Sequence, residues 1–118
     1  MTTKEIGDMG ENVACRYLEE KDYDILCRNY RTRFGEADII AKDDEVFVFV
    51  EVKTRRNNKF GEPSEAVNYY KQQRIKKVAM SYTDTINNDI RFDVIEVFYA
   101  PVYDSCEITR INHIENAF

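Results

Sequence analysis

Cysteine and histidine are scarce in this chain of 118 residues. The three cysteines, Cys15, Cys27 and Cys106, are odd in number and widely spaced, and no two form a C-x-x-C pair. This spacing argues against a disulfide framework and against a zinc site. His113 is the single histidine, so it is the one partner that a catalytic cysteine could have. We expect the cysteines to be reduced thiols and His113 to be structural.

Long apolar runs are also missing. No stretch approaches the roughly 18 apolar residues that a membrane-spanning helix needs, and residues 1–5 lack the apolar core of a signal peptide. With 43% hydrophobic and 33% charged residues, the composition is typical of a soluble folded protein. We expect a cytoplasmic protein with no membrane partner, built as a single domain over residues 1–118.

Positive charge is in deficit overall but not everywhere along the chain. The formal net charge is −5, which by itself disfavours a nucleic-acid partner. Residues 1–24 and 84–118 are both acidic, whereas residues 25–83 carry eight acidic and twelve basic side chains. Because the local field governs the binding of a polyanion, a nucleic-acid partner for the middle segment stays open.

The most apolar part of the chain predicts two strands, residues 36–41 and 46–55. Residues 46–50 read Val-Phe-Val-Phe-Val, a β-branched and aromatic run that favours a buried strand over a helix. The connection between the strands is short and polar, so an antiparallel hairpin is the simplest pairing. With Asp43-Asp44 as the turn, Asp38 falls opposite Phe49.

This hairpin gathers acidic side chains near a lysine. Side chains alternate along a strand, so Glu51 and Lys53 point to the same face. The expected register places Asp38 diagonal to Glu51 on that face, and Glu36 directly opposite Glu51. A slip of one residue would send Asp38 to the other face, so the arrangement depends on the register.

Charges in a core strand need partners or a metal ion, because burying an unpaired charge is costly. One interpretation is an ion pair between Lys53 and either Asp38 or Glu51. The other is a metal site, since two carboxylates with retained waters suit Mg²⁺. The metal would bind a phosphate oxygen and lower the pKa of a water, while Lys53 would orient that water or stabilise the developing charge. The second interpretation, with Mg²⁺ or Mn²⁺ as cofactor, predicts a phosphodiester hydrolase.

Motifs that accompany this hairpin extend along the chain. They are Gly10-Glu11-Asn12, Arg28-Asn29-Tyr30-Arg31, Gly35-Glu36-Ala37-Asp38, Phe49-Val50-Glu51-Val52-Lys53-Thr54-Arg55, Arg91-Phe92-Asp93-Val94 and Asn116-Ala117-Phe118. Together they resemble the PD-(D/E)XK, or restriction-endonuclease-like, nuclease superfamily. Within it, the chain looks like the YraN-like family, which is related to archaeal Holliday-junction resolvases. In one departure from the superfamily pattern, Ala37 and not a proline precedes Asp38.

The resemblance implies roles for individual residues. Asp38 and Glu51 would be metal ligands and Lys53 the catalytic lysine. Glu11 would match the helix carboxylate that resolvase-like relatives add to the site, and Glu36 is a further candidate ligand. The implied substrate is DNA, with branched or repair intermediates as candidates. Resolvase-like relatives act as two-fold dimers, so a homodimer is an open expectation.

The remaining pattern predicts the order helix, three strands, helix, two strands. Tyr70 and Val78 are placed on the buried stripe of the second helix, and Pro101 is expected to end the fourth strand. This order indicates an α/β (α+β) fold, a restriction-endonuclease-like three-layer sandwich with a mixed central sheet flanked by helices. The expected helices cover residues 6–21 and 63–87, and the expected strands cover residues 23–33, 36–41, 46–55, 91–100 and 106–111.

Basic side chains surround the predicted site. Any one of them could be an ordinary solvated side chain, but those next to the motif are placed to contact a phosphate backbone. The candidates are Arg31 and Arg33 on the first strand, Arg55, Arg56 and Lys59 after the site, and Lys71 and Arg74 on the second helix.

Two other classes of function remain open. A non-catalytic nucleic-acid-binding or accessory protein that kept the fold is favoured by the net acidity and by the lack of a base-reading element. Such a protein would be indifferent to Lys53→Ala. A purely structural interaction domain would have no affinity for nucleic acid even at low salt. The choices between DNA and RNA, and between one metal and two, also stay open.

Overall fold

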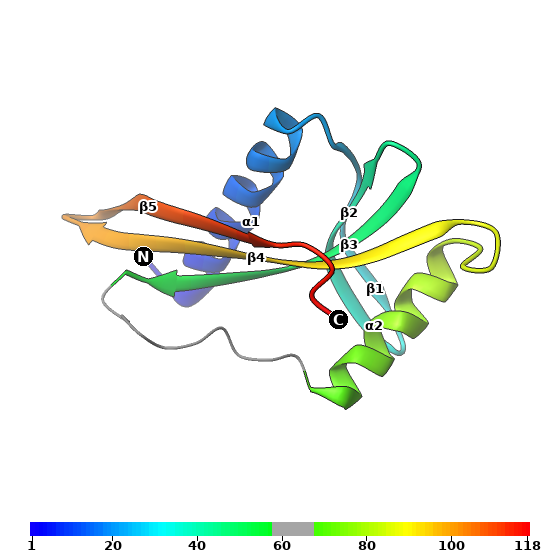
Figure 1. The fold of residues 1–118 in the computed structure, drawn as a ribbon. Coiled ribbons are helices and arrows are strands. Elements are labelled where there is room, and N and C mark those ends of the chain that lie inside the picture. Colours follow the sequence, from blue (N-terminus) through cyan, green and yellow to red (C-terminus); the bar gives the residue numbers. More distant parts are fainter. Residues whose placement is uncertain (58–67) are drawn as a thin grey trace.

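In the computed structural model, residues 1–57 and 68–118 are described. Over these two ranges, two helices and five strands follow in the order αβββαββ, as predicted (Figure 1). Within the described residues, no helix is long and apolar enough to cross a membrane. The elements are α1 (Thr3–Glu20), β1 (Asp24–Thr32), β2 (Gly35–Asp43), β3 (Val46–Arg56), α2 (Tyr69–Tyr82), β4 (Asp89–Val102) and β5 (Ser105–Ile114).

The five strands form one mixed sheet in the order β1-β2-β3-β4-β5. The strands β3 and β4 are parallel, and every other neighbouring pair is antiparallel. The last strand, β5, lies at an edge of the sheet and β4 lies inside it. β4 runs on through Pro101 to Val102, so the expected end at Pro101 is wrong. β3 ends opposite Tyr99, so Pro101 lies beyond the β3–β4 ladder. The N–H that proline lacks is therefore not needed for a hydrogen bond to β3.

Each face of the sheet carries one helix and its own apolar core. Ala14 and Leu18 of α1 pack with Ile39, Val50 and other aliphatic residues on one face. Val78 and Ala79 of α2 pack with Ile40 and Phe49 on the opposite face. The two helices cover opposite sides of the sheet (Figure 1). The molecule is therefore the three-layer α/β sandwich that the sequence predicted.

Helix α1 begins three residues before its predicted start because of a capping box. The side chain of Thr2 accepts a hydrogen bond from the N–H of Glu5, and the carboxylate of Glu5 accepts one from the N–H of Thr2, both at 3.1 Å. At Gly10 the helix comes very close to β3, since a Cβ there would lie 2.0 Å from Oγ1 of Thr54. Glycine is what permits this approach.

The hairpin between β2 and β3 has a different register from the predicted one. Asp43 pairs with Val46, so Asp44 and Glu45 form the turn in place of Asp43-Asp44. Asp44 has φ of 51°, a left-handed conformation that aspartate tolerates better than most residues. The prediction was therefore wrong by two positions along the ladder. A two-residue shift preserves the alternation of side chains between faces.

Helix α2 is shorter than predicted. Its N-cap is Asn68, which has extended backbone and accepts a hydrogen bond from the N–H of Lys71 at 2.9 Å. The predicted first turn at Pro63 lies outside the described residues. The helix ends at Tyr82 because Thr83 is extended, and the Asp84 side chain holds a turn beyond it.

Tyr70 was expected on the buried stripe of α2, and it is 77% exposed. The helix starts next to it, so the first turn projects past the edge of the core. Val78 and Ala79, more than two turns further on, are the residues of α2 that are buried.

His113 is structural, as expected. Its side chain is 4% exposed, and its Nε2 lies 2.7 Å from Oδ2 of the buried Asp93. Asp93 also accepts hydrogen bonds from Nε of Arg91 at 2.9 Å and from the N–H of Asn116 at 3.0 Å. This network ties β4 to β5 and to the residues that follow β5.

Candidate active site

Asp38 stands where β2 separates from β3. The ladder between the two strands ends at the pair Ile39 and Val50. Continuing its register by one residue brings Asp38 level with Glu51. In place of a backbone ladder bond, Oδ2 of Asp38 accepts a hydrogen bond of 2.8 Å from the N–H of Val52. Asp38 is therefore beside Glu51, where the predicted register had set it diagonally.

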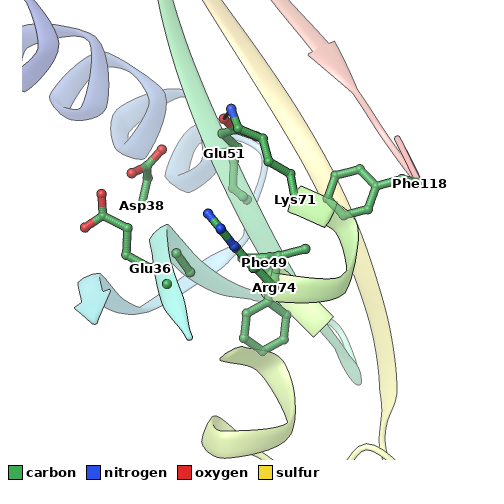
Figure 2. A pocket seen from close by; sticks show the side chains of 11 residues that line it. Glu36, Asp38, Phe49, Glu51, Lys71, Arg74 and Phe118 are labelled. Atoms are coloured by element: carbon green, nitrogen blue, oxygen red, sulfur yellow. Dashed lines mark ion pairs between the residues drawn. The ribbon is translucent and has the colours of Figure 1, made fainter. Parts of the chain in front are cut away.

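Two cavities border Asp38, one on each side of the sheet. The first, of about 260 Å³, lies between the sheet and α2, and Glu36, Asp38 and Glu51 contribute carboxylates to it. Lys71 and Arg74 reach into it from α2 (Figure 2). Glu36 lines this cavity but is not opposite Glu51 as predicted, because the observed register brings Asp38 to that position. Acidic and basic side chains thus face one another across a small open space.

The same cavity has apolar walls. Phe49 of β3, Ile75 of α2 and Phe118 line it beside the charged groups. Figure 2 shows Phe49 and Phe118 there. The ring of Phe118 stacks on Phe92 with centroids 5.2 Å apart and planes inclined by 16°. The N–H of Ala117 donates to the carbonyl of Phe92 at 2.7 Å. The last residues of the chain therefore pack back onto the sheet at this site.

The second cavity, of about 360 Å³, lies between α1 and β3, and Glu11 and Asp38 both line it. The close packing of Gly10 on Thr54 brings Glu11 against the sheet. Oε1 of Glu11 is buried, and none of the described residues gives it a hydrogen bond. Burial raises the pKa of Glu11 above its usual value. A buried carboxylate oxygen without a donor is an unusual and costly feature.

The pKa of the Asp38 carboxyl group is well above its usual value. Burial is the largest cause, and it raises the pKa of Asp38 to about 6 although the hydrogen bond from Val52 opposes the shift. The carboxylates of Glu11, Glu36 and Glu51 act in the same direction as burial. These three groups are close enough to repel a charge on Asp38, so a cation placed among them would be strongly favoured.

Lys53 lies two residues beyond Glu51 in β3, so the two side chains point to the same face. In the parallel ladder Lys53 is paired with Glu96 of β4. It lines neither of the two cavities. Glu51 itself forms an ion pair with Lys71, with Nζ 3.8 Å from Oε1. Because more than half of the Lys71 side chain is exposed, this pair contributes little to stability and can exchange.

Arg55 serves the fold. Its Nε lies 2.9 Å from Oε2 of Glu96, whose side chain is 3% exposed. Asn112 donates to the other carboxylate oxygen of Glu96 at 2.8 Å. A buried carboxylate needs such partners, so Arg55 is committed to Glu96.

The other basic candidates are spread around the site. Arg31 pairs with Glu36, with Nε 3.0 Å from Oε2, and both side chains are largely exposed. Arg33 lies over the ring of Phe34, 4.9 Å from its centroid. Arg56 is exposed at the end of β3. Lys59 lies outside the described residues. The structure thus brings Lys71 and Arg74 to the cavity, which is not lined by Arg31, Arg33, Arg55 or Arg56.

The donor set suits a hard divalent cation. Glu11, Glu36, Asp38 and Glu51 offer carboxylate oxygens alone, and these are the ligands that Mg²⁺ and Mn²⁺ prefer. The buried Oε1 of Glu11, which accepts no hydrogen bond from the described residues, also suits a metal ligand. In the arrangement seen here, no three ligating side chains among residues 1–57 and 68–118 converge closely enough to hold an ion. The chemistry therefore fits a metal, and binding would need these side chains to turn toward one another.

Residues 10–97 match the family described as "Uncharacterised protein family UPF0102". The chain belongs to this family. It is 51% identical to a UPF0102 protein of Alkaliphilus oremlandii, with 98% of each chain covered. It is 50% identical to one of Clostridioides difficile and 48% identical to one of Caldicellulosiruptor bescii, with all of each chain covered. The YraN-like resemblance seen in the sequence refers to this same family.

Sequence reasoning misjudged or overlooked three residues that line neither cavity, Tyr69, Tyr70 and Glu96. Tyr69 and Tyr70 are exposed at the start of α2, although Tyr70 had been placed in the core. The buried Glu96 was not singled out, although its position in an apolar strand was a signal that it needs a partner. The missed tyrosines had a signal too, because two adjacent aromatic residues on a helix cannot both face one core.

Proposed function

We propose that this protein is a metal-dependent phosphodiester hydrolase of the nuclease type, acting on DNA. One observation carries the proposal: Asp38 and Glu51 lie level where β2 and β3 separate, and a cavity opens on each side of Asp38. Asp38 and Glu51 would hold Mg²⁺ or Mn²⁺, with Glu11 and Glu36 as further oxygen donors. The resemblance to PD-(D/E)XK nucleases agrees with this assignment.

The chain's own residues would bind and orient the substrate. Lys71 and Arg74 line the cavity and would hold phosphate oxygens next to the carboxylates. When phosphate binds, Lys71 would leave its weak pair with Glu51 and so free that carboxylate. Lys53, on the same face as Glu51, would orient the attacking water or stabilise charge that develops on the phosphorus oxygens. A bound divalent cation would supply Lewis acidity and offset the charge of the phosphate.

A second candidate is a nucleic-acid-binding or accessory protein that does not cut. It is favoured by the carboxylates, since no three of those described converge on one point. It is also favoured by Lys53, which lies outside both cavities. Both candidates use the same basic side chains, so they differ in turnover and not in affinity.

Binding and cleavage measured side by side distinguish the two candidates. We would compare the wild type with Lys53→Ala and with the matched control Lys76→Ala, which removes an exposed lysine of α2 that lines neither cavity. A nuclease should lose cleavage in Lys53→Ala, keep its affinity for DNA, and be unaffected in the control. Equal affinity in all three proteins with no cleavage in any would establish the binder. Thermal melting of each variant checks that it is folded.

A homodimer with two such sites would suit a substrate with two equivalent strands. Sedimentation of the protein with and without a four-way junction tests this. A monomer in both conditions would contradict it.

A further inference from the structure

The first turn of α2 presents two large aromatic side chains to solvent. Tyr69 is 68% exposed and Tyr70 is 77% exposed. Their ring centroids are 5.9 Å apart and the ring planes are inclined by 77°. Exposed apolar residues scattered singly are normal in any protein, but two neighbouring rings at the same spot form a patch. Such a patch suggests a ligand with a flat apolar face.

The two tyrosines begin helix α2, directly before two basic side chains that line the cavity beside Asp38. Lys71 follows Tyr70 directly, and Arg74 is four residues beyond it, which places Tyr70 and Arg74 on one side of the helix. Both basic side chains line the cavity, and Figure 2 shows them reaching from α2 toward the carboxylates. A chain of nucleotides with its phosphate at Lys71 and Arg74 would therefore have its next base beside Tyr70.

The charge of α2 matches a polyanion. Its 14 residues include four basic side chains and no acidic one. The helix N-terminus, which carries partial positive charge, lies at the same turn as the two tyrosines. A cationic groove with aromatic rings alongside is the usual arrangement for binding single-stranded nucleic acid. A protein partner would gain less from this combination of four cationic side chains and exposed rings on one helix.

The state of the base decides what can bind here. In a continuous duplex each base is stacked on its neighbours, so its face cannot reach a side chain on the protein surface. An unpaired base can stack on a tyrosine, and it does so without regard to its identity. We propose that Tyr69 and Tyr70 form a stacking platform for an unpaired base, so that the site takes nucleic acid with an unpaired segment next to the phosphate at Lys71 and Arg74. This inference rests on the proposed function and adds the substrate class.

The test uses oligonucleotides that carry the fluorescent base 2-aminopurine, with Ca²⁺ in place of Mg²⁺ to suppress cutting. The base is placed in a single strand, in the unpaired arm of a flap and in a full duplex. We compare wild type, Tyr69→Ala/Tyr70→Ala, Tyr70→Phe and Tyr103→Ala. Tyr103 is a fully exposed tyrosine at the tip of the β4–β5 hairpin, away from α2 (Figure 1). It controls for the loss of any surface tyrosine.

The platform predicts quenching of the fluorescence of the unpaired base by the wild type, by Tyr70→Phe, which keeps the ring, and by Tyr103→Ala. The double alanine variant should lose the quenching and weaken single-strand and flap binding by about 5- to 150-fold, which is what the loss of stacking on one base produces. Its affinity for the duplex should change by less than about twofold. An equal loss for the duplex, or no loss for any oligonucleotide, would overturn the inference.

Failure of this inference is distinguishable from failure of the proposed function. Quenching that depends on the tyrosines, in a protein that never cuts, would support the platform and contradict the nuclease. Metal-dependent cutting of duplex and flap at equal rates, unchanged in the double alanine variant, would support the nuclease and contradict the platform. If α2 binds a protein and not nucleic acid, the tyrosine variants will affect no oligonucleotide, which also overturns the platform.

Discussion

Oδ2 of Asp38 accepts a hydrogen bond of 2.8 Å from the backbone N–H of Val52, the residue between Glu51 and Lys53. This bond replaces the ladder at the point where β2 and β3 part, and it fixes Asp38 beside the Glu-Val-Lys segment. The backbone thus determines which carboxylates and which lysine share one end of the sheet.

The ionisation of Asp38 should cost stability at neutral pH. The pKa of Asp38 is raised in the folded state, so ionising this carboxyl destabilises the folded protein relative to the unfolded chain. The free energy of unfolding should therefore fall as the pH rises from 3.8 to about 6 and stay at the lower value at higher pH. Asp38→Asn removes the charge and keeps an acceptor for Val52. We expect the variant to be more stable than the wild type by about 1–3 kcal/mol at pH 7.5 without metal, and equally stable below about pH 4. Urea denaturation across this range measures the difference. A variant less stable than wild type at pH 7.5 would contradict the account.

A divalent cation should stabilise the folded protein through the carboxylate cluster. A ligand that binds only the native state raises the melting temperature as its concentration passes its Kd. We expect Mg²⁺ or Mn²⁺ to raise the melting temperature of the wild type and to have a smaller effect on Glu11→Gln. Glu107→Gln, an exposed site on β5, is the matched control and should respond as the wild type does. An equal response in all three proteins would show that Glu11 does not contact the metal.

The approach of α1 to β3 should depend on Gly10. A Cβ at this position would lie 2.0 Å from Oγ1 of Thr54, and rotation of that side chain would still leave the Cβ of Thr54 only 3.1 Å away. We expect Gly10→Ala to destabilise the protein by about 1–3 kcal/mol, as overpacking usually does. The control is Gly7→Ala on the same helix, where a Cβ has open space. It should stabilise by about 0.5–1 kcal/mol.

Chemical denaturation of the two glycine variants gives both numbers. If Gly10→Ala were as stable as Gly7→Ala, the close contact with Thr54 would not hold the helix. Because Glu11 follows Gly10, the destabilised variant should also respond less to added Mg²⁺ or Mn²⁺.

Substitution of Arg55 should reduce folding stability, whereas substitution of its neighbour Arg56 should reduce DNA affinity. Arg55→Ala removes one partner of the buried ion pair with Glu96, so we expect a loss of about 3–5 kcal/mol in the free energy of unfolding. Arg56→Ala removes an exposed side chain and should change stability by less than about 0.5 kcal/mol. Its effect should be on DNA affinity, which we expect to fall most at low salt. If Arg55→Ala kept its stability and lost DNA binding, Arg55 would be a DNA-contacting residue and the structural role assigned to it would be wrong.

The sequence predicted the fold better than it predicted the details of the site. The run at residues 46–50 is apolar at every position, so its strand was evident, and the alternation that puts Glu51 and Lys53 on one face follows from strand geometry. The turn was misplaced because Asp43, Asp44 and Glu45 are all plausible turn residues, and the left-handed φ of Asp44 became evident only in the folded chain.

Packing decided what the local pattern could not. Tyr70 has the helical spacing of a core residue, yet α2 starts so close to it that its ring projects into solvent. Arg55 has the spacing of a residue next to the site, yet the position of Glu96 on the neighbouring strand determines its partner. Both outcomes depend on contacts between segments far apart in the chain.

The most direct test of the central claim is cleavage of a labelled panel by purified protein with Mg²⁺ or Mn²⁺. The panel holds a four-way junction, a flap, a single strand, a duplex and a structured RNA, and Asp38→Asn is assayed beside the wild type. The account predicts metal-dependent cutting of DNA by the wild type, preferentially next to unpaired bases, and none by Asp38→Asn. No cutting of any substrate by the wild type, or equal cutting by both proteins, would contradict it.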